Sequence, residues 1–224
     1  MNLLTLHQSA LIALPFALIL TTAFVFNLCS KRLGKEAGYL LGFLFYWTVW
    51  CSLVPLLYLG WDGFLSLFVD VTPLFSRPNW PAAVLFILIG FVSLVMYGKS
   101  FLRAPLSLIS LAIPVATING ICEELLWRGL YVRAFPNNLW LALLFPAIGF
   151  ALWHFIPLQA FSEGSKLAFV LSTFFLGLAY GWIAYRTGSA KWTAVSHSLN
   201  GILALSGRLA PSILTLLLLR RSNE

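Results

Sequence analysis

The sequence predicts an all-α fold, a polytopic transmembrane bundle of seven to eight helices. Hydrophobic residues make up 60% of the 224 residues, and charged residues only 9%. The mean hydropathy is +0.91, whereas a soluble domain averages about 45–50% apolar residues. Apolar runs of roughly 20 residues recur along the chain, each long enough to cross about 30 Å of hydrocarbon. With no linker-like stretch and no internal repeat, we expect a single integral-membrane domain over residues 1–224.

The apolar runs predict seven spans, at residues 8–29, 39–61, 82–98, 106–135, 139–159, 167–189 and 191–207. The first run lacks the basic start and small-residue cleavage site of a secretory signal, so we expect it to be a span. Segment 62–81 is too polar to cross and fits the membrane interface, with Trp61 and Trp80 at its ends. The fourth span contains Pro114, which would allow a kink or break. The apolar tail 211–219 would rise only about 14 Å as a helix and need not cross.

Basic residues in the connections predict the orientation. If the connection after the first span is cytoplasmic, most basic residues lie on that side: Lys31, Arg32, Lys35, Lys99, Arg103, Lys166, Arg208, Arg220 and Arg221. The opposite side carries Arg77, Arg133, Arg186 and Lys191. Provided that the tail does not cross, this bias predicts an outside N-terminus and a cytoplasmic C-terminus in the cell membrane. Because these charges are scattered over short connections, the net charge of +7 does not indicate nucleic-acid binding.

Five acidic, basic or histidine residues lie away from the ends of the predicted spans: Glu123, Glu124, Arg128, His154 and His197. A charge at the bilayer centre costs at least about 2.5–3.5 kcal/mol, so such residues are functional candidates. Glu124 and Arg128 are four residues apart and can pair on one helical face. Glu123 lies about 100° further round the helix. It shares a face with Asn119, and pairing of Glu124 with Arg128 leaves it without a cationic partner on its own helix.

This set of side chains suits hydrolysis of an acyl bond. Burial and a like-charged neighbour favour the neutral form of a carboxylic acid, which suits a general base. We therefore predict that Glu123 activates water and that Glu124, with Arg128, supports and orients it. His154 and His197, with Asn200, could stabilise an oxyanion. The two histidines and a carboxylate could instead bind a divalent metal such as zinc, and a purely structural salt-bridge cluster remains an alternative.

Three motifs resemble those of the CAAX-protease and bacteriocin-processing (CPBP, Abi) family of intramembrane proteases. EELLWR, residues 123–128, resembles the EExxxR motif, and FALWH, residues 150–154, resembles FxxxH. HSLN, residues 197–200, resembles the third motif, HxxxN or HxxxD. The motifs occur in the family's order within about residues 110–205. One departure is that Gly201 occupies the fourth position after the histidine, while Asn200 lies one residue earlier on a nearby face.

The resemblance implies an intramembrane endopeptidase that cleaves a membrane-anchored protein or peptide by C-terminal, sorting-tail or CAAX-like processing. It implies that Glu123 activates water and that His154, His197 and Asn200 complete the site, within a protease domain whose core spans about 106–207. Because the sequence lacks an HExxH pattern, a conventional zinc helix is not predicted. A glutamate-type mechanism with no required cofactor is therefore favoured over a metal-dependent one. A compact chain of this kind resembles the prokaryotic members.

Other functions fit parts of the pattern. A non-catalytic membrane scaffold or a bacteriocin self-immunity protein would keep the helices without turnover. A cysteine-type enzyme could use Cys122, which points about 100° away from Glu123 on the helix. Cys29, Cys51 and Cys122 show no CxxC spacing, so neither a disulfide framework nor a metal knuckle is predicted. A transporter could use buried carboxylates, but the sequence has no repeated pair of interrupted spans.

Overall fold

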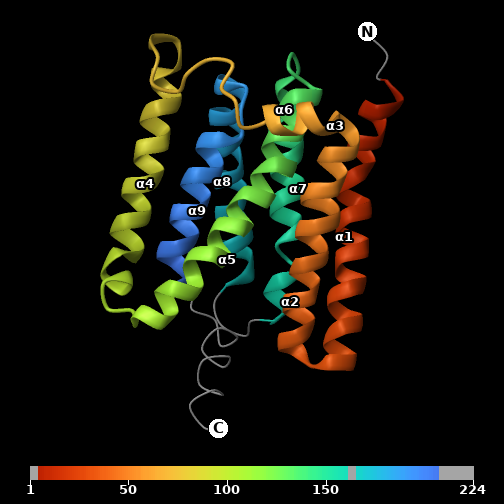
Figure 1. Cartoon of the computed structure of the whole chain (residues 1–224), viewed down its shortest axis with the longest axis vertical. Helices are drawn as coiled ribbons and strands as arrows, with labels where there is room; N and C mark the ends of the chain where they lie inside the picture. The colour runs from red at the N-terminus through yellow and green to blue at the C-terminus, as the bar shows by residue number, and fades with distance from the viewer. Residues whose placement is uncertain (1–4, 161–164, 207–224) are drawn as a thin grey trace.

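The computed structural model describes residues 5–160 and 165–206 (Figure 1). Every regular element within these residues is helical, which confirms the predicted all-α bundle. The first two spans are α1 (Leu6–Leu33) and a helical segment made of α2 (Lys35–Phe45), the π-helical η1 (Tyr46–Leu53) and α3 (Val54–Ser66), which is kinked at Gly60 with a φ of +69°. The 3₁₀ turn η2 (Arg77–Asn79) leads into α4 (Trp80–Phe101).

The motif-bearing half begins with α5 (Leu106–Glu124), which continues as the π-helical η3 (Leu125–Leu130) and as α6 (Tyr131–Ala134). The next span comprises the π-helical η4 (Trp140–Leu144), α7 (Phe145–Trp153) and the 3₁₀ turn η5 (Pro157–Ala160). The last helices are α8 (Lys166–Thr187) and α9 (Lys191–Leu205). Six of these segments are long and apolar enough to cross a membrane, so the protein is a multi-pass membrane protein. The shorter α9 occupies the predicted seventh span, and the tail 211–219 lies outside the described residues.

Local chemistry explains how the first hairpin of helices forms. Thr5 caps α1 in a reciprocal capping box with Gln8. Gly34 then turns the chain with a φ of +91°, a conformation that L side chains rarely adopt. A Cβ atom on Gly38 would lie 2.1 Å from the Ser30 hydroxyl, and one on Gly42 would lie 2.3 Å from the Phe26 ring. These two glycines therefore allow α1 and α2 to approach closely.

The segment between α3 and α4 lies at one end of the bundle, beside the start of α9 (Figure 1). Leu67 and Leu74 are buried there. Asp70 accepts a hydrogen bond from the Trp192 indole at 2.8 Å and pairs with Lys191 at 3.3 Å. The segment is thereby held against α9.

The fourth span differs from expectation in where its helix changes geometry. The α-helix continues through Pro114 without a break and gives way to π-helical geometry only at Leu125. Proline is tolerated in membrane helices because neighbouring groups can satisfy the freed carbonyl. The π-helical turn instead follows Glu123 and Glu124 directly, and such turns are frequent at functional sites.

Small residues bring α5 and α9 together. A Cβ atom on Gly120 would lie 2.6 Å from Ser198 Oγ and 2.7 Å from the Ser198 backbone nitrogen. A Cβ atom on Gly201 would lie 2.9 Å from Ala116 Cβ. This close packing brings the histidine of α9 to the level of the two glutamates of α5.

Candidate active site

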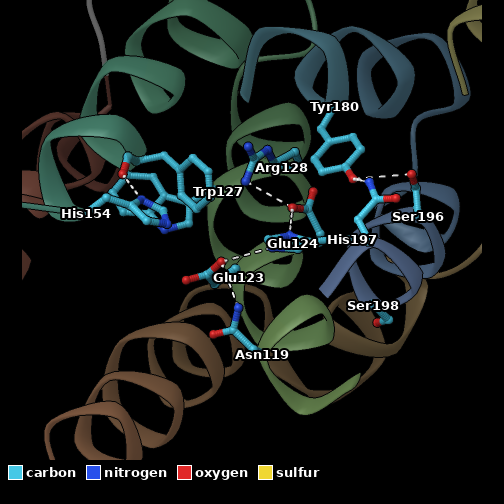
Figure 2. Close-up of polar contacts among 12 residues, drawn as sticks. Asn119, Glu123, Glu124, Trp127, Arg128, His154, Tyr180, Ser196, His197 and Ser198 are labelled. Carbon is cyan, nitrogen blue, oxygen red and sulfur yellow. Dashed lines mark hydrogen bonds and ion pairs between the residues drawn. The ribbon is translucent and has the colours of Figure 1, made fainter. Parts of the chain in front are cut away.

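The two glutamates, the arginine and one histidine meet inside the bundle (Figure 2). Glu124 Oε1 lies 3.0 Å from an Arg128 guanidinium nitrogen and 2.8 Å from His197 Nδ1. The other ring nitrogen, His197 Nε2, lies 3.4 Å from Glu123 Oε2. The side chains of Glu123 and Glu124 are 1% and 0% exposed. His197 therefore bridges two carboxylates that adjoin on α5 and lie 73 or more residues away from it in sequence.

Hydrogen-bonding capacity limits where the protons of this cluster can reside. A carboxylate oxygen only accepts, and an imidazolium donates from both ring nitrogens. The imidazolium form of His197 thus satisfies both of its carboxylate contacts. Two carboxylates, one guanidinium and one imidazolium carry no net charge, which reduces the cost of burying them. Transfer of one proton from His197 to Glu123 would leave the total charge unchanged.

Aromatic rings and a glycine hold Arg128 in place. Its guanidinium carbon lies 4.2 Å from the centroid of the Phe150 ring and 5.6 Å from that of Tyr180. A Cβ atom on Gly177 would lie 3.3 Å from Nη2 of this arginine. The guanidinium is therefore stacked between α7 and α8 with its charge directed at Glu124, an arrangement that suits arginine better than lysine.

A second group of hydrogen bonds reaches Glu123 from the other side. The Asn119 amide donates from Nδ2 to Glu123 Oε2 at 3.2 Å. The Trp47 indole donates in turn to Asn119 Oδ1 at 2.9 Å. Within the described residues, the second oxygen of Glu123, Oε1, is buried and has no hydrogen-bond partner. The carboxylate is thus held through one oxygen while the other remains able to accept.

His154 directly follows α7, and its ring packs edge-on against Phe150 with the centroids 4.5 Å apart. Phe150 in turn lies 6.3 Å from the His197 ring. His154 Nδ1 is 2.7 Å from the carbonyl oxygen of Phe150. Because a carbonyl only accepts, Nδ1 carries the proton and the neutral ring presents Nε2 as a lone pair. Figure 2 shows the ring on the α7 side of the site, away from the ion-pair cluster.

Asn200 faces α8 rather than the glutamates. Its amide donates to the Tyr180 hydroxyl at 2.7 Å, and that hydroxyl donates to Ser196 Oγ at 3.2 Å. The Tyr180 ring lies 5.6 Å from the His197 ring, centroid to centroid. The structure therefore brings Glu123, Glu124, Arg128 and His197 into direct contact and places Asn200 one layer behind the His197 ring.

The predicted metal set of two histidines and a carboxylate is not assembled. The described chain contains no group of three or more His, Cys, Asp or Glu side chains placed to hold a metal ion. The Phe150 ring contacts both His154 and His197. These residues therefore do not fit a zinc site, and we derive no step through a metal.

Cys122 points to a different side of α5. Its Sγ lies 4.0 Å from Ser52 Oγ in η1, and it packs beside the larger apolar core. That core includes Tyr46, which accepts a hydrogen bond from the Trp127 indole at 2.7 Å and stacks on Trp153 at 3.9 Å. The adjacent residues Cys122 and Glu123 thus face different parts of the bundle, as their angular separation on the helix predicted.

Sequence reasoning missed the aromatic partners of the site. Trp47 carries no local signal, because its partner Asn119 lies on another span. Phe150 is the first residue of the FxxxH motif, but the motif predicts no contact with Arg128. Tyr180 belongs to a glycine- and aromatic-rich stretch, residues 178–189, whose pattern is typical of close helix packing. Gly181 does pack in that way, since a Cβ atom there would lie 3.0 Å from Leu143.

Comparison with protein families identifies the motif-bearing half. Residues 105–203 match the family model described as type II CAAX prenyl endopeptidase Rce1-like. The match covers all three motifs and confirms the resemblance to the CAAX-protease family. Comparisons with curated proteins and with solved structures found no match. The family indicates an intramembrane endopeptidase whose substrate is a membrane-associated protein in a lipid bilayer.

Proposed function

We propose that this Rce1-like protein is a glutamate-type intramembrane endopeptidase, acting as a single domain with Glu123 as general base. The observation that carries the proposal is the state of the Glu123 carboxylate. It is 1% exposed, it is held through Oε2 by Asn119 and His197, and its Oε1 has no partner among the described residues. A buried acceptor of this kind is suited to taking a proton from water.

The hydrolytic step follows from these positions. Glu123 Oε1 accepts a proton from water as the water oxygen attacks the carbonyl carbon of the scissile amide. The C–O bond forms and the carbonyl oxygen becomes an oxyanion. When the intermediate collapses, the C–N bond breaks and the proton held on Glu123 passes to the leaving nitrogen. One water is consumed, and a carboxylic acid and an amine are released.

The remaining cluster holds Glu123 in place. Arg128 neutralises Glu124 at 3.0 Å, and Glu124 orients His197 by accepting from its Nδ1 at 2.8 Å. His197 then presents Nε2 to Glu123 Oε2. We assign Glu124 and Arg128 the supporting roles that the motif suggested, because they act on Glu123 through this histidine.

His154 and Asn200 occupy different layers of the site. His154 lies on the α7 side with Nδ1 bonded to the Phe150 carbonyl. With the proton on Nδ1, Nε2 of the neutral ring can accept a hydrogen bond from water or substrate. Asn200 acts through Tyr180 on the His197 ring, so we assign it a positioning role rather than contact with substrate.

The substrate class and orientation complete the proposal. We infer that the enzyme cleaves near the C-terminus of a membrane-anchored protein or peptide in a CAAX-like or sorting-tail reaction. The turn after α1 and the connection between α4 and α5 lie at one end of the bundle, and the ends of α6 and α8 lie at the other (Figure 1). Lys31 belongs to the last turn of α1 and Arg103 to the α4–α5 connection, whereas Arg133 and Arg186 belong to the last turns of α6 and α8. This separation supports a cytoplasmic position for the first end and an outside N-terminus in the cell membrane.

The decisive experiment uses the purified full chain in lipid nanodiscs with a farnesylated CAAX peptide that carries a fluorophore and a quencher on either side of the scissile bond. Glu123→Gln is expected to lower kcat at least 10³-fold, because an amide cannot take the proton, while the melting temperature changes little. Cys122→Ala should retain activity. Full cleavage by Glu123→Gln would exclude the glutamate mechanism.

The natural substrate can be identified in cells. Membrane proteomics of wild-type and Glu123→Gln strains should reveal a protein whose C-terminus is shorter in the wild type. An unchanged set of protein ends, together with a cellular role kept by Glu123→Gln, would instead indicate a non-catalytic scaffold or self-immunity protein.

A further inference from the structure

We infer that Asn119 and, through it, Trp47 are positioning residues that select which oxygen of Glu123 accepts the proton. The inference rests on the proposed function of Glu123. Neither residue belongs to the three motifs, and Trp47 lies 72 residues before Asn119 on a separate span. Their contacts form an unbroken line from η1 through α5 to the catalytic carboxylate (Figure 2 shows the Asn119–Glu123 link).

The first link fixes the orientation of the Asn119 amide. The indole N–H can only donate, so the atom of Asn119 that faces Trp47 at 2.9 Å must be the carbonyl oxygen. The NH₂ group then points along the helix toward Glu123, one turn further on. Trp47 and Glu123 require the same orientation of the Asn119 amide, because the indole donates to the amide oxygen and the carboxylate accepts from the amide nitrogen. Trp47 thus prevents the amide from turning its oxygen toward Glu123.

The second link makes the two oxygens of Glu123 unequal. Oε2 receives Asn119 Nδ2 at 3.2 Å and faces His197 Nε2 at 3.4 Å, whereas Oε1 is buried without a partner among the described residues. A hydrogen-bond donor and an ion-pair partner on the same oxygen restrict the rotation of the carboxylate. The geometry therefore directs Oε1 to the water.

The surroundings of Trp47 limit its movement. Its ring lies 5.4 Å from the Phe43 ring, which lies 5.6 Å from the Trp153 ring and so joins the aromatic core next to His154. Trp47 is the second residue of the π-helical η1, in which the chain departs from regular α geometry as it passes α5. An indole held in this way can restrain the amide that it contacts.

The departure in the third motif gives this amide a further significance. Gly201 stands where the family pattern has Asn or Asp, and it packs directly against Ala116 on α5. Asn200, the neighbouring amide, bonds to Tyr180 instead. Among the described residues, the amide that contacts Glu123 therefore comes from Asn119 on the glutamate's own helix.

The test is a double-mutant cycle with Trp47→Phe and Asn119→Ala, in nanodiscs with the farnesylated peptide. Trp47→Phe keeps the ring and removes only the N–H donor. We expect Asn119→Ala to lower kcat 10- to 100-fold and Trp47→Phe to lower it 5- to 30-fold, with KM within twofold. The double variant should equal Asn119→Ala alone, because Trp47 acts only through the amide. Trp50→Phe is the matched control, since that indole in the same π-helical segment donates to Thr21 on α1 at 3.1 Å.

A labelling experiment separates failure of the relay, which we define as the contacts from Trp47 through Asn119 to Glu123, from failure of the proposed function. Dicyclohexylcarbodiimide modifies protonated carboxyl groups in membranes, and mass spectrometry reports the rate at Glu123 without any substrate. Loss of the Asn119 donor favours the protonated carboxyl, so Asn119→Ala should increase labelling at least threefold and Trp50→Phe should not. Unchanged labelling in folded Asn119→Ala, independent effects on kcat in the double variant, or an equal loss in Trp50→Phe would each overturn the relay. If labelling of Glu123 increases in Asn119→Ala as expected, but the protein does not cleave the peptide, only the proposed peptidase activity would be rejected.

Discussion

Two carboxylate–cation pairs in this molecule have similar separations and opposite surroundings. Glu124 and Arg128 lie 3.0 Å apart with side chains 0% and 2% exposed. Asp70 and Lys191 lie 3.3 Å apart at the end of the bundle, where the lysine is 45% exposed. The distance between the two charges is therefore similar in both pairs, but the first pair is surrounded by protein and the lysine of the second is in contact with solvent.

The difference shows what burial adds to an ion pair. Water can solvate Lys191 when Asp70 is removed, and Asp70 keeps the hydrogen bond from the Trp192 indole when Lys191 is removed, so the pair contributes little to stability. Neither Glu124 nor Arg128 has that alternative, and each depends on the other and on His197. A pair of this kind fixes geometry more than it stabilises the fold, which suits the positioning role proposed for it.

The largest effect that this comparison predicts is on the buried pair. Arg128→Met leaves Glu124 buried without its guanidinium and should lower the free energy of unfolding by about 3–5 kcal/mol. Unfolding in detergent, followed by intrinsic fluorescence, measures the loss. Arg128→Lys should recover part of it. A loss below that of Lys191→Met would mean that solvent reaches Glu124 and that the pair is not buried in function.

An intermediate effect is expected where α5 packs on α9. Gly120→Ala would place a Cβ atom 2.6 Å from Ser198 Oγ, so the helices must separate. Overpacking of this kind costs about 1–3 kcal/mol. It should also lower peptide cleavage, because the contact between His197 and Glu123 spans the same two helices.

The matched control for the packing variant is Gly90→Ala in α4. A Cβ atom on Gly90 meets no atom within 4 Å, so this variant should keep both stability and activity. Equal destabilisation by the two substitutions would show that helix propensity or membrane insertion, rather than the α5–α9 contact, determines the loss.

The smallest effect concerns the exposed pair. Lys191→Met should lower the free energy of unfolding by about 0.2–1 kcal/mol. The difference from wild type should shrink near 1 M salt, where the Debye length is about 3 Å. A loss of stability that does not depend on salt would mean that this pair is shielded from solvent, as Glu124 and Arg128 are. Asp70 would then retain its bond to the Trp192 indole as its remaining partner.

The sequence predicted those parts of the site that depend on one helix. The four-residue spacing of Glu124 and Arg128 predicted their ion pair, and the spacing of Asn119 and Glu123 predicted their shared face. The apolar runs predicted the spans, because the thickness of a bilayer fixes the length of each helix. The three motifs predicted a resemblance to the CAAX-protease family, and residues 105–203 match its Rce1-like model.

The sequence did not predict which side chains on different helices contact one another. The direction in which Asn200 points depends on the rotation of α9, and offsets of three and four residues differ by about 100°. Its amide therefore faces Tyr180, although a position near the histidine was expected. The Trp47–Asn119 contact crosses 72 residues and leaves no local pattern. His154 follows a helix that ends at Trp153, so the distance of its side chain from the membrane surface does not follow from counting residues along one straight helix.

The position of His197 on the last helix of the described chain has a consequence for biogenesis. The segment that carries Glu123, Glu124 and Arg128 enters the membrane with one more acid than base, and the balancing imidazole is made 73 residues after Glu124. A chain interrupted before Lys191 holds an unmatched acid without the imidazole that contacts it. Under the proposed function, the site is therefore complete only when α9 has docked.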